Sequence, residues 1–151
     1  MCLTKIRTSS RNCIIFKIKD HLRADINSSV LESIFEALYV NRNCQALYLQ
    51  NLTNSLKDQQ LHGLVNLLKK KRNIWCLNIG ENYSVSNEAW SFFCNQLPNT
   101  SITHLYVSEH VISLKLKDEM RMHIRKNRKK HDMHCSVRNL QIIEKCTNMW
   151  W

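Results

Sequence analysis

Glycine and proline are nearly absent from this chain of 151 residues, which contains two glycines and one proline. Loops that cradle a phosphate need several glycines close together, because their backbone N–H groups must approach the phosphate closely. The sequence therefore excludes a glycine-rich nucleotide-binding loop. The same scarcity argues against a β-sandwich, since that fold is built from many tight turns.

Acidic residues are also scarce, with twelve Asp and Glu against 22 Lys and Arg, for a formal net charge of +10. Eight basic residues lie between positions 115 and 130, beside Asp118 and Glu119, and a second basic run occupies 69–72. This excess favours an acidic protein, a nucleic acid or an anionic membrane surface as the partner. Alternatively, each run is a solvated helix end, where cations favour the negative end of the helix dipole.

Long apolar stretches are missing as well. No run approaches the roughly 18 apolar residues of a membrane-spanning helix, and the N-terminus lacks the apolar core of a secretory signal. Seven cysteines are present, an odd number without a visible pairing pattern, and Cys13, Cys44 and Cys76 stand at expected strand positions. We therefore predict free thiols in a reducing compartment, and a cytoplasmic or nuclear location.

A short phrase recurs four times at nearly constant spacing. It consists of two aliphatic or aromatic residues around one variable residue, and its copies begin at Phe16, Leu47, Leu77 and Leu105. These positions are 31, 30 and 28 residues apart. A period of this length, with a short strand and one helix in each unit, is typical of a solenoid.

The repeat predicts four strand–helix units, at residues 13–43, 44–73, 74–101 and 102–132, after an N-terminal extension at 1–12. Their strands are expected at 14–18, 46–50, 75–79 and 104–107. A parallel sheet follows, because each helical crossover returns the chain to the same side. Residues 133–151 are expected to form a helical cap over the last unit, since its inner face would otherwise meet water.

Helix limits can also be read from the sequence. Ser29 with Glu32 three residues later matches a capping box, and Ser86 is a second candidate N-cap. The second helix is expected over about 57–71 and the fourth over about 115–130. Pro98 is expected to stop the third helix.

The segment 74–79 followed by Asn82 resembles a leucine-rich repeat of the ribonuclease-inhibitor type, which has an L-x-x-L-x-L strand, an Asn and one full helix. The second and fourth units match only in the strand, with Leu52 and His110 where the Asn is expected. This resemblance covers about residues 13–130. It implies a short α/β solenoid that binds a protein.

The segment 125–151 resembles the closing segment of some protist and algal leucine-rich-repeat proteins. In those proteins the chain continues beyond a tryptophan pair like Trp150 and Trp151. We therefore expect a truncated cap, in a fragment or in a copy that has lost repeats.

In such a solenoid, strand residues that alternate with the buried ones lie on the concave face. Tyr48 and Tyr106 would offer there the large, rigid contacts that are enriched at binding hot spots. The sequence therefore predicts a scaffold or adaptor that binds a protein through this face. The predicted contact residues are Lys17, Tyr48, Gln50, Asn78, Tyr106 and Ser108.

The basic C-terminal helix is expected to steer an acidic partner, raising the association rate more than the affinity. Two other uses stay open: nucleic-acid binding through the helix at 115–130, and nuclear import. The run from Arg125 to Lys130 has no interleaved aromatic residue on which a base could stack. The predicted basic patch comprises Arg121, Arg125, Lys126, Arg128, Lys129 and Lys130.

No catalytic residue, metal site or cofactor is predicted. His131, His134, Cys135 and Cys146 lie within one segment, but their spacing does not match the short ligand pairs of zinc sites. The seven Cys and seven His allow many pairings and single out none as an activated nucleophile. We therefore expect a binding protein rather than an enzyme, with self-association through open repeat ends as a further expectation.

Overall fold

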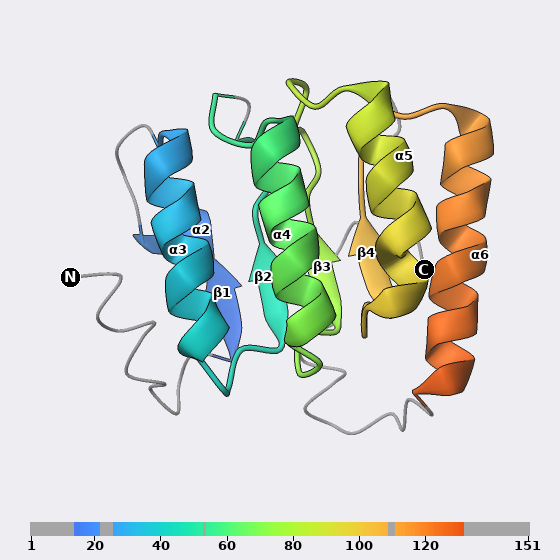
Figure 1. Ribbon diagram of the computed structural model, residues 1–151, viewed down its shortest axis with the longest axis horizontal. Helices are drawn as coiled ribbons and strands as arrows, with labels where there is room; N and C mark the ends of the chain where they lie inside the picture. Colours follow the sequence, from blue (N-terminus) through green and yellow to red (C-terminus); the bar gives the residue numbers. More distant parts are fainter. Residues whose placement is uncertain (1–13, 22–25, 53, 109–110, 132–151) are drawn as a thin grey trace.

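The computed structural model describes residues 14–21, 26–52, 54–108 and 111–131. Strands and helices alternate along the chain and form two layers (Figure 1). The strands are β1 (Ile15–Lys17), β2 (Ala46–Tyr48), β3 (Cys76–Asn78) and β4 (His104–Tyr106). The helices are α2 (Ile18–His21), α3 (Ser28–Val40), α4 (Asp58–Lys70), α5 (Asn87–Gln96), the 3-10 helix η1 (Leu97–Asn99) and α6 (Leu114–Lys130).

The four strands pair in parallel in the order β1-β2-β3-β4. Their register aligns the recurring triplets, so Phe16, Leu47, Leu77 and Leu105 lie side by side across the sheet. The predicted α/β repeat fold with a parallel four-stranded sheet is therefore confirmed. β1 and β4 are the outer strands of the described sheet. Self-association through them, like the exact repeat boundaries, stays a prediction.

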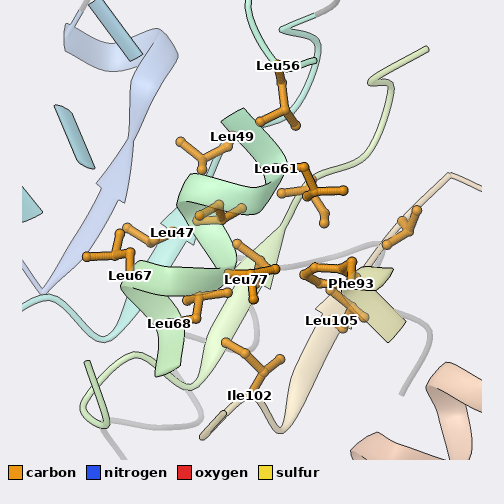
Figure 2. Packing of buried hydrophobic residues seen from close by; sticks show 14 of the residues in the cluster. Leu47, Leu49, Leu56, Leu61, Leu67, Leu68, Leu77, Phe93, Ile102 and Leu105 are labelled. Atoms are coloured by element: carbon orange, nitrogen blue, oxygen red, sulfur yellow. The ribbon is translucent and has the colours of Figure 1, made fainter. Parts of the chain in front are cut away.

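Helices α3, α4, α5 and α6 cover one face of the sheet (Figure 1). The hydrophobic core fills the space between the two layers, where Leu47, Leu77 and Leu105 are fully buried. Figure 2 shows these leucines beside Leu68 of α4 and Phe93 of α5. Helix α4 has an apolar face, because Leu61, Leu64, Val65 and Leu68, at helical spacing, are buried in the core.

The helix termini agree with the predictions in two places and differ in one. The Ser86 hydroxyl accepts a hydrogen bond from the Ala89 N–H and caps α5, and Pro98 lies in η1, directly after that helix. For α3, however, the predicted cap at Ser29 is wrong. Asn27 caps this helix through a bond from the Val30 N–H to Oδ1 of 2.9 Å, and Ser29 lies inside the helix. Both residues are good caps, so composition alone did not separate them.

Each strand is shorter than predicted, with three residues. The first unit differs most, because Ile18 begins the short helix α2 instead of extending β1. The predicted extension at 1–12, the predicted cap at 133–151 and its tryptophan pair lie outside the described residues.

The turn after β3 depends on Asn82, which is fully buried. Its Nδ2 donates to the carbonyl oxygens of Leu49, Ile79 and Gly80, and its Oδ1 accepts from the Leu52 N–H. These bonds satisfy backbone groups of two successive units. The Asn identified in the sequence motif therefore joins the second unit to the third.

Asn127 performs a similar task from within α6, where no motif indicated it. Its Nδ2 donates to the carbonyl oxygens of Leu97, at 2.9 Å, and Ile102, at 2.8 Å. Because Asn127 is only 2% exposed, these bonds hold the end of α6 against η1 and the start of the fourth unit.

Candidate functional site

Four of the predicted contact residues occupy one row across the strands, on the sheet face opposite the helices. The register aligns Lys17 with Tyr48, Tyr48 with Asn78, and Asn78 with Tyr106. The Lys17 ammonium lies 5.2 Å from the centre of the Tyr48 ring, and Asn78 Nδ2 donates to Gln50 Oε1 at 2.8 Å. The fold therefore brings together residues that are about 30 positions apart in the sequence.

This row is less exposed than the sequence suggested. Tyr48 and Asn78 are each 7% exposed and Ser108 is 5% exposed, whereas Lys17, Gln50 and Tyr106 are half-buried. Asn78 and Ser108 are engaged in the turn after β3, where Asn78 Oδ1 accepts from the Gly80 N–H and Ser108 Oγ accepts from the Glu81 N–H. Lys17, Gln50 and Tyr106 are thus the accessible members of the predicted set.

A second apolar cluster lies on the same face of the sheet. It is formed by Ala46, Tyr48 and Cys76, with Trp75 and the isoleucines at 14 and 15 packed against it. We did not predict Trp75 here, because strict alternation from Cys76 would turn it toward the helices. Ile74 and Leu77 are both buried in the core between the sheet and the helices, with two residues between them. Strict alternation allows only an odd number of residues between two that share a face, so this spacing indicated that Trp75 or Cys76 would depart from the alternation.

His104 is the buried histidine among the described residues of this face. Its ring makes an edge-on contact with Trp75, with the ring centres 5.2 Å apart, and its Nδ1 lies 3.0 Å from the Thr103 hydroxyl. Burial lowers the pKa of His104 to about 4, and the nearby positive charge of Arg128 acts in the same direction. This histidine is therefore neutral at physiological pH.

The six residues of the predicted basic patch do not form a uniform group. Arg121 pairs with Asp118 at 3.3 Å, and Arg128 is half-buried, with its Nε donating to the Thr103 carbonyl oxygen at 2.8 Å. Burial lowers the pKa of Arg128, and Arg125 adds to that shift. The remaining members are exposed on α6: Arg125, Lys126, Lys129 and Lys130.

The other basic run, at 69–72, contacts neighbouring units at the end of α4. Lys71 Nζ donates to the Tyr39 carbonyl oxygen at 3.1 Å, and Arg72 Nη1 donates to the Asn99 carbonyl oxygen at 3.0 Å. Lys70 Nζ lies 5.3 Å from the centre of the Tyr39 ring. The alternative prediction for this run was a solvated helix end. Three of its cations contact neighbouring units in addition to their exposure to solvent.

A shallow groove of about 870 Å³ lies at the opposite ends of the helices, where α3, α4 and α5 begin. Hydrogen bonds from the Ser86 backbone N–H and hydroxyl lower the pKa of Asp58, which lines the groove with Glu32. Gln60 Nε2 donates to Glu32 Oε1 at 2.9 Å, while Gln60 Oε1 meets no donor. Tyr83 borders the groove and is 60% exposed. This groove was not predicted from the sequence, because its lining comes from three separate units.

The described ranges contain no cluster of three or more Cys, His, Asp or Glu side chains that could hold a metal ion. The thiols of Cys44, Cys76 and Cys94 are buried, and the reducing compartment stays a prediction. Burial raises the pKa of Cys94 to about 11, so this thiol stays protonated at neutral pH. The histidines and cysteines at 131–146, for which no metal site was predicted, lie almost wholly outside the described residues. Within those residues, we also find no helix with the length and apolar character to cross a membrane.

No protein-family model and no curated protein matched the chain. Several solved structures share its fold, two of which are a tropomodulin and a leiomodin domain. One is the tropomodulin C-terminal domain of Caenorhabditis elegans, with a TM-score of 0.56 and 13% identity over 93% of this chain and 96% of that one. The other is the leiomodin-1 actin-binding site 2, with a TM-score of 0.55 and 12% identity over 96% of this chain and 95% of that one. Identities this low establish the fold alone.

The comparison corrects the predicted family. The structural neighbours are leucine-rich-repeat-like domains of tropomodulin and leiomodin, so the assignment to the ribonuclease-inhibitor type is wrong. The strand pattern around Leu77 and the buried Asn82 serve any solenoid with one strand and one helix per unit. They therefore indicated the architecture, which is confirmed, and did not distinguish one repeat class from another.

Proposed function

We propose that this chain is a protein-binding module, a scaffold or adaptor, whose contact surface is the sheet face opposite the helices. The observation that supports this proposal most is that the predicted contact residues lie together on this face, with Lys17, Gln50 and Tyr106 accessible among them. Tyr48 and Asn78 position two of these accessible side chains, because the Tyr48 ring contacts the Lys17 ammonium and Asn78 Nδ2 donates a hydrogen bond to Gln50 Oε1. Ser108 fixes the adjoining turn.

Actin is the first partner to test. The solved leiomodin-1 domain that shares this fold is an actin-binding site. The chain carries a net charge of +10, which favours an acidic partner and would raise the association rate by electrostatic steering. The exposed cations of α6 would contribute to this steering. A cytoplasmic or nuclear location stays a prediction.

The experiment is a binding titration of the purified chain with monomeric actin, together with cosedimentation with actin filaments. We expect Tyr106→Ala and Lys17→Ala to weaken binding by about tenfold, as truncation of a hot-spot residue does. Tyr83→Ala is the matched control, because Tyr83 is 60% exposed and lies at the groove, away from the sheet face. We expect this control to bind as the unmodified chain does.

Two results would contradict the proposal. Failure to bind either form of actin would reject actin as the partner. Binding that survives Tyr106→Ala and Lys17→Ala but is lost in Tyr83→Ala would move the contact surface from the sheet face to the groove.

A further inference from the structure

The helices of the solenoid all run in the same direction, so their C-terminal ends lie along one edge, at the bottom of Figure 1. The two basic runs of the sequence, at 69–72 and 125–130, both end there. Arg42 follows the end of α3 and adds to them. We call this set the basic edge, and it comprises Arg42, Lys69, Lys70, Lys71, Arg72, Lys126, Arg128, Lys129 and Lys130.

Direct contacts make the basic edge continuous between α3 and α4. Lys71 Nζ donates to the carbonyl oxygen of Tyr39, in the last turns of α3, at 3.1 Å. Burial lowers the pKa of Lys71, and the positive charge of Arg42 adds to this shift, which places Arg42 close to Lys71. The ends of α3 and α4 therefore present their cations together.

The helix η1 connects the end of α4 to the end of α6. Arg72 Nη1 donates to the Asn99 carbonyl oxygen, and Asn127 Nδ2 donates to the Leu97 carbonyl oxygen, so both basic ends contact this one short helix. Two runs more than 50 residues apart in the sequence thus meet on one edge. Packed helices lie about 8–10 Å apart, so the edge extends for roughly 30 Å.

Acidic side chains are concentrated at the other ends of the helices. Glu32, Asp58 and Glu88 lie in or near the first turns of α3, α4 and α5. The segments 37–57, 59–80 and 120–131 contain no Asp or Glu, Glu36 lies one turn before the end of α3, and Asp132, which follows the last segment, is outside the described residues. The charge of the described chain is therefore separated along the helix axes.

An exposed aromatic residue lies among the cations of the basic edge. Tyr39 is 48% exposed at the end of α3, and Lys70 Nζ is 5.3 Å from the centre of its ring. The sequence run from Arg125 to Lys130 lacks such a residue, and the fold supplies it from another unit. Cations beside an exposed aromatic ring are the usual elements of a surface for single-stranded nucleic acid.

We propose that the basic edge binds single-stranded nucleic acid, with the phosphates contacting its cations and a base stacking on Tyr39. A long row of cations suits a linear polyanion, whereas a protein interface needs a central set of buried apolar anchors. A duplex would offer no unstacked base to Tyr39. This surface is separate from the sheet face, so the two proposals can fail independently.

The test is fluorescence anisotropy of a labelled single strand of about 12 nucleotides and of its duplex, at about 50 and about 200 mM salt. Two edge variants each remove two exposed cations: Arg42→Gln with Lys69→Gln, and Lys129→Gln with Lys130→Gln. The matched control, Lys57→Gln with Lys115→Gln, removes two exposed cations from the helix starts. We expect each edge variant to lower single-strand affinity about tenfold and to flatten the salt dependence, and the control to change it less than about twofold.

Tyr39→Ala tests the stacking contact, with Tyr83→Ala as its control. We expect Tyr39→Ala to lower single-strand affinity at least about fivefold, to leave duplex affinity unchanged, and to retain the far-UV circular dichroism of the unmodified chain. Tyr106→Ala, on the sheet face, should bind the oligonucleotide normally.

Three outcomes would overturn the proposal. No single-strand binding at the lower salt concentration would reject it. Equal losses in the edge and control variants would show that only the net charge matters. Binding to polyglutamate but not to the oligonucleotide would assign the basic edge to an acidic protein instead.

Discussion

The ring of Tyr106 lies directly over Gly80, on the sheet face opposite the helices. A β-carbon at residue 80 would lie 2.3 Å from Cε1 and 2.7 Å from Cδ1 of this ring, so close that the ring would have to shift. Glycine at position 80 therefore allows this close packing, and the backbone there has no positive φ. The missing side chain of one residue thus helps to set where Tyr106, the more accessible of the two predicted contact tyrosines, lies.

Gly80→Ala is expected to destabilise the chain by about 1–3 kcal/mol, because Tyr106 must move to accommodate the methyl group. Urea unfolding monitored by circular dichroism measures this change. In the Tyr106→Ala background, the same substitution should cost much less. An equal cost in both backgrounds would show that Tyr106 is not the residue displaced.

Gly63→Ala is expected to have the opposite effect on the stability of the chain. Gly63 lies inside α4, and a β-carbon there would be 3.6 Å from Cδ2 of Phe35, an ordinary van der Waals distance. The substitution should stabilise the chain by about 0.5–1 kcal/mol, since glycine is a poor helix former. The same urea measurement tests it. Destabilisation would show that α3 and α4 pack more closely than the structure indicates.

Asn82→Ala should destabilise the chain by about 3 kcal/mol or more, because it leaves several buried backbone groups without partners. Thermal unfolding gives the change in stability. The control is Asn66→Ala, at an exposed position of α4, where we expect a change within about 0.5 kcal/mol. Similar losses in both variants would contradict a special role for Asn82.

Stability should fall as the pH is lowered from about 6.5 to about 4, in part through His104. Its pKa is about 4 in the folded chain and about 6.5 in the unfolded chain, so the unfolded chain binds more protons in this interval. The contribution is therefore complete above about pH 6.5 and is lost toward about pH 4, and it amounts to about 3 kcal/mol at most.

Urea unfolding at several pH values checks this expectation. His104→Gln should show a shallower pH dependence than the unmodified chain, while Asn66→Ala, which changes an exposed residue that does not titrate, should not. Burial also lowers the pKa of His123, so some dependence should persist in His104→Gln. An unchanged pH dependence in His104→Gln would contradict the assignment.

The parallel sheet could be predicted because its information is local and repeated. Each unit places an aliphatic or aromatic residue at the same offset, as at Leu47, Leu77 and Leu105, and one period sets the register of all four strands. The helix limits were predicted where a cap and an apolar face agree, as at Ser86. They were wrong where two good caps are close, as with Asn27 and Ser29, because their local energies are nearly equal.

The surfaces could be predicted less well, because they depend on which residues of different units become neighbours. Tyr39 and Lys70 are 31 positions apart, and only the stacking of α3 on α4 brings them together. The same holds for Trp75 and His104 on the sheet face. The exposure of the contact residues also could not be predicted from the sequence, because alternation along a strand predicts the direction of a side chain and not what surrounds it.

The bonds formed by Asn82 connect the second unit to the third, and those formed by Asn127 connect the third to the fourth. Helix packing follows the same rule, because α3 contacts α4, α4 contacts α5, and α5 contacts α6. A force applied to the two outer units would therefore pass through every boundary in series, and the weakest boundary would set the load at which the molecule yields. The solenoid would come apart in steps of about 30 residues, and a part that keeps two or more units would still hold paired strands and packed helices.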